Sequence, residues 1–259
     1  MLIAGLLFFF SGLLDTKPAP VFTDVYFGTQ GPYRFLVDTG AETSLIDPAL
    51  ATKLRLQPTF RAEVLTAQNR RLVPGTKVTN LRLGNQAIPE TELLFYDVAA
   101  ARRLDPSVKG LLGLSALTGF NFTLSPGSGQ MDAGAKRPAG EVVPFSKIDG
   151  RMAVKARMGT ETLTLILDSG STHIVLFRMP VAMARTHPVS TTFSTLDGAR
   201  SVVPTCWTED MFFTERLRVG MLPAAIVERK DTQAEGLLPA SVFKKVYVDQ
   251  ERSELVLVR

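Results

Sequence analysis

The chain has few of the side chains on which disulfides and metal sites depend. Its 259 residues include one cysteine, Cys206, and two histidines, and neither an HExxH nor a CxxC motif occurs. A single cysteine excludes an internal disulfide, and with two histidines it leaves too few soft ligands for a structural zinc site. We therefore expect no metal site, and we interpret Cys206, beside Trp207, as a small buried apolar residue.

Long runs of one charge are also missing. The formal charge of +4 arises from 29 basic and 25 acidic residues, with the signs interspersed and basic residues adjoining in pairs such as Arg70-Arg71. No Lys/Arg-rich stretch is interleaved with aromatic residues, so the sequence carries no footprint of nucleic-acid binding. Because 45% of the residues are hydrophobic and 21% are charged, the chain can bury a sizeable core and is neither disordered nor fibrous.

The first residues form the longest apolar segment, MLIAGLLFFFSGLL at 1–14. This uncharged run is short for a bilayer span but has the length of a signal-peptide core. There is no Lys or Arg near the start and no A-x-A cleavage site, so a lipid-anchor helix or a misassigned start remain alternatives. We interpret residues 1–19 as a signal peptide or membrane anchor, and we expect export to a secreted, periplasmic or membrane-associated location.

The rest of the chain reads as strands, with short apolar or alternating runs separated by Gly, Pro, Asn and Asp, which predicts an all-β fold. Strands are predicted at Val21–Phe27, Arg34–Val37, Lys77–Leu83, Leu163–Leu167, Glu215–Val219 and Glu254–Val258. Short helical segments are predicted at Asp47–Leu54, Ala99–Leu104 and Ser241–Lys244. The stretch Ser125–Gly140 is rich in Gly, Pro, Ala and Ser without periodicity, which is typical of a linker.

Division of the chain at this stretch reveals an internal repeat. Each half has an apolar strand that runs into an acidic tripeptide, which contains Asp38 in the first half and Asp168 in the second. A Gly-Leu-Leu sequence follows, beginning at Gly110 and Gly236, 72 and 68 residues after the aspartate. The repeat predicts an N-terminal lobe over 20–130, a linker over 131–148 and a C-terminal lobe over 149–259.

The two aspartates suggest chemistry because a single carboxylate is a weak acid and a weak base at neutral pH. If the two halves pack around a pseudo-two-fold axis, Asp38 and Asp168 meet near the axis, where both cannot ionise together. They would share one proton and could activate a water molecule between them. The apolar strands before both aspartates argue against ordinary surface turns, which is the other interpretation of such tripeptides.

The residues that follow each aspartate suit this arrangement. Gly40 and Gly170 permit the close backbone approach that a tight loop at the axis requires. The hydroxyl groups of Thr39 and Ser169 can form hydrogen bonds to the opposite loop. We therefore expect these four residues to support the pair of aspartates.

Two segments carry a family resemblance. FLVDTGAETSLID, residues 35–47, resembles the active-site loop of retroviral and retropepsin-like aspartic proteases, and LILDSGSTHIVLF, residues 165–177, resembles its partner loop. Gly110–Leu114 resembles the strand that supports each Asp loop. The resemblance covers roughly 20–259, and two such loops with a supporting strand are a specific signal, whereas one tripeptide is not. The chain is similar to single-chain, bacterial-type members of the pepsin/retropepsin superfamily.

The resemblance implies the acid-protease fold: two similar β-barrel-like lobes related by a pseudo-two-fold axis, a cleft between them and a hairpin flap. It implies an aspartic endopeptidase that cleaves peptide or protein substrates as a monomer, without a metal or cofactor. By order along the chain, the flap is expected around Thr66–Gly75 and its equivalent around Ser194–Ser201. The residues that bind the substrate are not identified by the sequence.

Two residues depart from the family pattern. Pro239 replaces the glycine of the second supporting strand, and proline cannot donate a ladder hydrogen bond. His173 follows Asp168 closely, where a charged imidazole could lower the pKa of the pair, although an inert loop position is the simpler interpretation. Pro239 leaves open a second function, that of an aspartic-protease-like protein that binds a peptide or partner with little or no catalysis.

A serine hydrolase built on Gly113-Leu114-Ser115 is a further alternative. The nucleophile elbow of such enzymes needs a glycine two residues after the serine, and this chain has Leu117 there. We therefore exclude this alternative.

Overall fold

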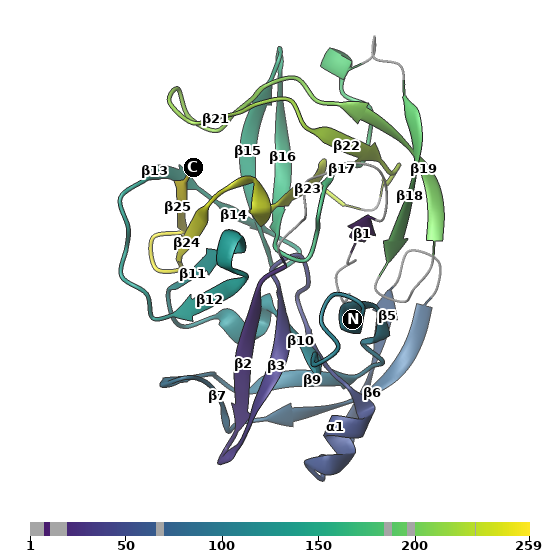
Figure 1. Cartoon of the computed structure of the whole chain (residues 1–259), viewed down its shortest axis with the longest axis vertical. Helices are drawn as coiled ribbons and strands as arrows, with labels where there is room; N and C mark the ends of the chain where they lie inside the picture. The colour runs from purple at the N-terminus through teal and green to yellow at the C-terminus, as the bar shows by residue number, and fades with distance from the viewer. Residues whose placement is uncertain (1–7, 11–19, 66–69, 184–187, 196–199, 231) are drawn as a thin grey trace.

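The computed structural model of the chain describes all residues except 1–7, 11–19, 66–69, 184–187, 196–199 and 231. The described residues form two β-sheets, of 14 and 11 strands, with a few short helices at their margins (Figure 1). The predicted all-β fold of two similar lobes is confirmed.

The 14-stranded sheet contains most of the first half of the chain. Its main path runs in the order β13 (Glu141–Pro144), β25 (Glu254–Val258), β24 (Lys245–Asp249), β11 (Phe122–Ser125), β12 (Gln130–Ala133), β2 (Phe22–Phe27), β3 (Gln30–Asp38), β10 (Gly110–Gly113), β4 (Ser44–Ile46), β9 (Thr91–Phe95), β6 (Arg70–Val78) and β5 (Phe60–Leu65). Off this path, β7 (Leu81–Leu83) pairs with β2 and β8 (Gln86–Ala87).

The 11-stranded sheet is built mainly from the second half. Its main path runs in the order β1 (Phe8–Phe10), β18 (Val189–Thr195), β19 (Arg200–Trp207), β22 (Pro223–Ile226), β17 (Ile174–Leu176), β23 (Gly236–Pro239), β16 (Glu161–Asp168), β15 (Arg151–Met158), β20 (Met211–Phe212) and β21 (Arg218–Val219). Off this path, β14 (Ser146–Ile148) pairs with β15. The short helices are α1 (Pro48–Lys53), α2 (Ala99–Arg102) and the 3-10 turns η1 (Leu114–Leu117), η2 (Pro126–Ser128), η3 (Val181–Met183) and η4 (Ala240–Val242).

The internal repeat appears as one strand order used twice. In the first half, β2, β3, β10, β4, β9, β6 and β5 are neighbours in that order, and in the second half β15, β16, β23, β17, β22, β19 and β18 follow the same order. The first Gly-Leu-Leu strand, β10, lies between β3, which ends at Asp38, and β4. The second, β23, lies between β16, which ends at Asp168, and β17. The two halves are therefore the same structural unit, each with one aspartate at the same position.

The core explains why these strands form. In β16 the side chains from Leu165 to Asp168 are all buried, as are those from Phe35 to Asp38 in β3. Strands buried on both faces read as continuous apolar runs, which is the pattern that the sequence shows before each aspartate. One continuous hydrophobic cluster includes Val37 and Leu167, so the core passes from one half to the other beneath the aspartates.

The predicted linker is not free of secondary structure. Residues 131–148 contain most of β12 and all of β13 and β14, and β13 pairs with the C-terminal strand β25 in register from Glu141 with Leu257 to Pro144 with Glu254. The 14-stranded sheet thus takes β24 and β25 from the second half of the chain. Within the Gly- and Pro-rich stretch Ser125–Gly140, β12 pairs antiparallel with β11, so composition did not prevent pairing where a partner strand supplies the hydrogen bonds.

Two predicted strands also need correction. The stretch Lys77–Leu83 is not one strand, because β6 ends at Val78 and β7 begins at Leu81, with a turn between them where the Gly28 amide donates to the Asn80 carbonyl at 2.8 Å. Of Glu215–Val219, only β21 is extended. The predicted helical segments appear as α1, α2 and η4, and α1 begins as expected, with the Asp47 carboxylate accepting from the Ala49 amide at 2.9 Å.

The predicted leader and flaps fall partly outside the described residues. Of residues 1–19, only β1 is described, and it pairs antiparallel with β18. No helix among the described residues has the length and apolar character needed to cross a membrane. The centres of both predicted flaps, 66–69 and 196–199, lie outside the described residues, but the hairpins that lead to them, β5–β6 and β18–β19, lie on the same side of the molecule (Figure 1).

Candidate active site

The two aspartates are held by equivalent ladders. Strand β10 runs parallel to β3, with Gly113 beside Asp38, and antiparallel to β4. Strand β23 runs parallel to β16, with Pro239 beside Asp168, and antiparallel to β17. Each aspartate therefore stands at the end of a central strand, and the supporting strand next to it, β10 or β23, is paired on both of its edges. A rigid sheet thus sets the position of each aspartate.

Four hydrogen bonds join the two aspartate loops to each other. The Thr39 amide donates to Ser169 Oγ at 3.0 Å, and the Ser169 amide donates to Thr39 Oγ1 at 3.0 Å. The hydroxyl of Thr39 in turn donates to the Leu167 carbonyl at 2.8 Å, and that of Ser169 donates to the Val37 carbonyl at 2.7 Å. The structure thus has the cross-loop bonds that the sequence predicts for Thr39 and Ser169, and they are reciprocal, as a pseudo-two-fold axis requires.

Each carboxyl group is anchored through one oxygen. Asp38 Oδ1 accepts from the Gly40 and Ala41 amides at 2.9 and 3.1 Å, and Asp168 Oδ1 accepts from the Gly170 and Ser171 amides at 2.8 and 3.0 Å. The second oxygens, Oδ2 of both aspartates, are buried and have no hydrogen-bond partner among the described residues. The two carboxyl groups are close enough to interact with each other. A buried pair of carboxyl oxygens that no other group satisfies is unusual, and it is suited to a polar reactant.

Burial and mutual repulsion shift the titration of the pair. Burial, and then the negative charge of Asp168, raise the pKa of Asp38 well above its ordinary value. Burial also raises the pKa of Asp168 to about 6, against the opposing effect of the Gly170 amide. Near neutral pH the pair therefore holds one proton and one negative charge, and the two steps belong to the pair as a unit.

Glycines let the two loops approach this closely. A β-carbon on Gly40 would lie 2.4 Å from Asp168 Cγ, which no side chain could occupy. On the supporting strand, a β-carbon on Gly110 would lie 2.1 Å from Phe35 Cε1. Gly40, predicted as a supporting residue, is thus required by direct contact with the opposite carboxyl group.

The departure at Pro239 is accommodated by a change at a second position. In the first half, the Gly113 amide donates to Ser44 Oγ at 3.0 Å. In the second half, Pro239 has no amide hydrogen, and Ile174, six residues after Asp168 as Ser44 is after Asp38, has no acceptor. A hydrogen-bonded pair is thus replaced by an apolar pair, so that no polar group of either side chain is left unsatisfied.

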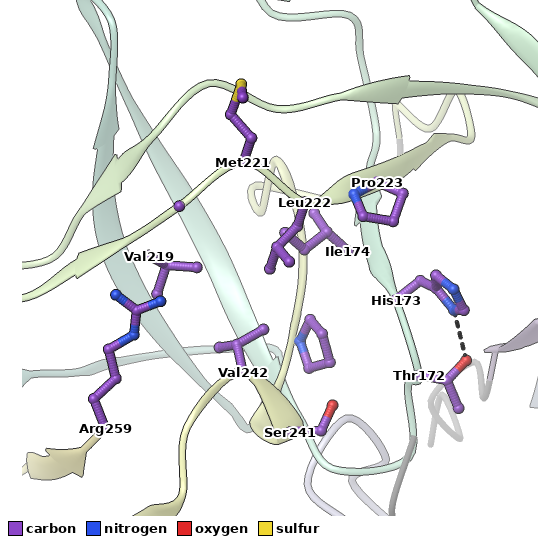
Figure 2. Close-up of a pocket in the computed structure, with 12 residues that line it drawn as sticks. Thr172, His173, Ile174, Val219, Met221, Leu222, Pro223, Ser241, Val242 and Arg259 are labelled. Carbon is purple, nitrogen blue, oxygen red and sulfur yellow. Dashed lines mark hydrogen bonds between the residues drawn. The ribbon is translucent and has the colours of Figure 1, made fainter. Parts of the chain in front are cut away.

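His173 lies away from the carboxyl groups in the described contacts. Its Nδ1 lies 2.9 Å from Thr172 Oγ1, and burial lowers its pKa, so the ring is neutral near neutral pH (Figure 2). Both residues line a cavity of about 330 Å³ that also borders Pro239, Leu222 and Val242. Neither aspartate lines this cavity, which lies behind the second aspartate loop.

Sequence reasoning missed two charged residues near the pair. Glu42 is four residues after Asp38, and burial raises the pKa of its carboxyl while the charge of Arg151 lowers it. Arg151 also lowers the pKa of Asp168, although burial has the larger, opposite effect. Glu42 could have been suspected from its place in the loop, but nothing in the local sequence marks Arg151, which is brought there by strand pairing. In the part of the chain that the structure describes, no three Asp, Glu, His or Cys side chains gather as metal ligands would.

Part of the chain is similar to a known protein family, and solved structures of low sequence identity align with most of its length. Residues 23–116, which contain Asp38, match the aspartyl protease family. No curated protein is similar enough in sequence to count as a relative. Basic 7S globulin from soybean is 12% identical, with 98% of this chain and 94% of that chain covered and a TM-score of 0.49. Conglutin gamma from lupine seeds is 13% identical, with 98% and 95% covered and a TM-score of 0.48.

The family match covers the first aspartate loop, and the second half repeats that loop, its supporting strand and its hydrogen bonds. The two loops meet at a buried pair of carboxyl groups that together can hold one proton. The match to the aspartyl protease family thus covers the first aspartate loop and its supporting strand, and the second half repeats both around Asp168.

Proposed function

We propose that this protein is an aspartic endopeptidase in which Asp38 and Asp168 are the catalytic residues. The observation that carries this proposal is a pair of interacting carboxyl groups whose buried Oδ2 atoms are satisfied by no other described residue, on two reciprocally bonded loops. Structural carboxylates in a protein interior are normally paired or fully hydrogen-bonded. Burial of two carboxyl groups, each with one oxygen that lacks a hydrogen bond from another residue, lowers the stability of the fold. A catalytic role explains why such a pair is present.

The chemistry follows from the shared proton. The ionised carboxylate accepts a proton from water, whose oxygen attacks the peptide carbonyl carbon, while the protonated carboxyl donates its proton to the carbonyl oxygen. The tetrahedral intermediate then loses its C–N bond as a proton is transferred to the amine nitrogen, and the pair again holds one proton. The proton belongs to the pair as a unit before reaction.

The surrounding residues have supporting roles in this proposal. Thr39 and Ser169 fix the distance between the loops, and the amides of Gly40 and Gly170 hold one oxygen of each carboxyl group so that the other faces the substrate. Because both aspartates come from one chain, the site is complete in a monomer. The proposed substrate is a peptide or an unfolded protein segment, and an exported location remains part of the proposal.

Binding without catalysis is the alternative that Pro239 suggested. The structure weakens the support for this alternative. Pro239 stays in register with Asp168, and the amide hydrogen that it lacks would have no acceptor, because Ile174 stands at the position of Ser44. A binding protein also has no need of two carboxyl groups with raised pKa values. We therefore retain endopeptidase activity as the proposed function.

The test is cleavage of an unfolded protein such as casein by the full chain between pH 3 and 9, with Asp38→Asn and Asp168→Asn as variants. Asp24→Asn, at an exposed position on β2, is the matched control. We expect both dyad variants to lose cleavage, the control to keep it, and a statine-type inhibitor to block it. Tight binding of the inhibitor without turnover would favour the binding protein, and cleavage that survives both substitutions would exclude the proposed mechanism.

A further inference from the structure

The two halves of the site differ in charge at one equivalent position. In the second half, Ala153 of β15 pairs with Ile166 of β16 in an antiparallel ladder. Continued for two residues beyond this last pair of the ladder, the count aligns Arg151 with Asp168. Arg151 is close enough for its charge to act on that carboxyl group.

The first half has no cation there. Phe22 of β2 pairs with Leu36 of β3, and the same count places Pro20 beside Asp38. The chain before β2 still follows β3, since the Val37 amide donates to the Val21 carbonyl at 2.8 Å. Arg151 and Pro20 thus occupy matching places in an otherwise repeated site, and only the second half carries a positive charge.

Arg151 is placed to act over a distance. Its side chain is 11% exposed, so its charge is poorly screened by solvent, and it donates to Asp149 Oδ2 at 3.0 Å. Asp149 is 53% exposed, which makes it a weak neutralising partner. The turn between them lies against the first aspartate loop, because a β-carbon on Gly150 would lie 3.0 Å from Glu42 Oε1.

The charged groups around Arg151 come from every element packed against it. They are Asp149 in the turn, Glu42 with Glu92 beyond it, and the pair of aspartates, while Lys147 on β14 is exposed. These neighbours are acidic apart from Lys147, so a buried guanidinium is tolerated there. Because the exposed Asp149 neutralises Arg151 only in part, the remaining positive charge of Arg151 acts on the carboxyl group of Asp168.

We propose that Arg151 is a positioning residue that makes the dyad asymmetric, stabilising the anion on Asp168 and setting the lower pH limit of activity. This inference rests on the proposed function. Without the cation the pair would hold both protons at a higher pH, because an anion loses stability when a nearby positive charge is removed. The doubly protonated pair cannot accept a proton from water, so the acid limb of activity would move upward.

The experiment compares pH profiles of kcat/KM for the full chain and four variants. Arg151→Met removes the charge, and we expect its acid limb to move upward by about 0.5 to 1 pH unit, a three- to tenfold loss at a fixed pH below the limb. Arg151→Lys should restore the wild-type limb. Asp149→Asn removes the neutralising partner and should move the limb downward. Lys155→Met, an exposed cation on the same strand, is the control and should leave it unchanged.

A second readout does not depend on catalysis. The free energy of unfolding is measured against pH for proteins with Asp168 and with Asp168→Asn. The pH at which the difference between the two changes is the titration midpoint of Asp168. This midpoint should move upward in Arg151→Met and downward in Asp149→Asn, as the acid limb does. If the wild type cleaves nothing, the proposed function fails while the midpoint still tests Arg151.

The inference is overturned if Arg151→Met changes neither the titration midpoint of Asp168 nor the acid limb of kcat/KM. It is also overturned if Lys155→Met shifts them as much as Arg151→Met does. If Arg151→Met does not fold, Asp149→Asn decides. Asparagine tolerates the left-handed backbone of position 149, where φ is 49°, so this variant keeps the turn. An unmoved midpoint in Asp149→Asn would then overturn the inference.

Discussion

Replacement of Asp168 by asparagine should stabilise the protein at neutral pH. Asparagine keeps an oxygen that accepts from the Gly170 and Ser171 amides, now 2.8 and 3.0 Å from Asp168 Oδ1. Its amide group replaces the oxygen that has no partner, and it can donate to the carboxyl of Asp38. The substitution thus removes a buried titratable group while it preserves the shape and anchoring of the loop.

The size of the effect follows from the shifted pKa. Burial moves the pKa of Asp168 from 3.8 to about 6, and one pKa unit corresponds to about 1.4 kcal/mol, so the folded chain resists ionisation of this carboxyl by about 3 kcal/mol. Because the pKa is raised by folding, the stability is full below about pH 4 and is lost as pH rises through 6. A loss of this size is a large fraction of a typical folding free energy.

The assay is urea unfolding of the wild type and Asp168→Asn at pH 4 and pH 8, with Asp24→Asn as the exposed control. We expect the stability of Asp168→Asn relative to wild type to rise by about 3 kcal/mol between the two pH values, and the control to show no such change. A relative stability that is the same at both pH values would refute the reasoning, because the carboxylate would then ionise as easily in the folded as in the unfolded chain.

Three further substitutions test the supporting residues. Gly40→Ala should lower kcat/KM by about 100-fold or more, because its β-carbon would lie 2.4 Å from Asp168 Cγ. Gly127→Ala, which has open space around it, is the control and should leave kcat/KM unchanged. Equal activity of the two variants would contradict the close approach of the loops. Thr39→Val should cost about 2 to 4 kcal/mol in urea unfolding, since it leaves the Leu167 carbonyl and the Ser169 amide unpaired, and Thr39→Ser should restore most of it. Pro239→Gly should lower the free energy of unfolding by about 1 kcal/mol, and Ile174→Ser should lower it further because Ile174 is a buried core residue. The double variant should lose less than the sum of the two, because it recreates the bond that Gly113 makes with Ser44; a lack of coupling between the two changes would count against the paired replacement.

Much of the fold and the centre of the site could be predicted from the sequence because they depend on local pattern and on repetition. The apolar strands before Asp38 and Asp168 indicate burial, and two copies of one loop imply that equivalent residues meet. The hydroxyl-to-loop bonds of Thr39 and Ser169 follow from the same symmetry. No long-range information beyond the repeat was needed for these features.

Features that depend on pairing between distant strands could not be predicted in this way. The pairing of β12 with β11 gives a strand to a stretch whose composition indicates a linker. The compensation of Pro239 by Ile174 is visible only when the two halves are compared residue by residue in the folded sheet. The pairing of β15 with β16 brings Arg151 close enough to Asp168 for its charge to act on the carboxyl group, and the sequence neighbours of Arg151 give no sign of it.

The central claim is that the two aspartates share one proton near neutral pH, and the pH profile of kcat/KM for cleavage by the wild-type full chain tests it most directly. We expect a bell-shaped profile whose acid limb has an apparent pKa of about 6, because activity requires the pair to have lost one of its two protons. Activity that is highest near pH 3 and falls steadily as the pH rises would contradict the account, since the pair would then ionise as ordinary carboxyl groups.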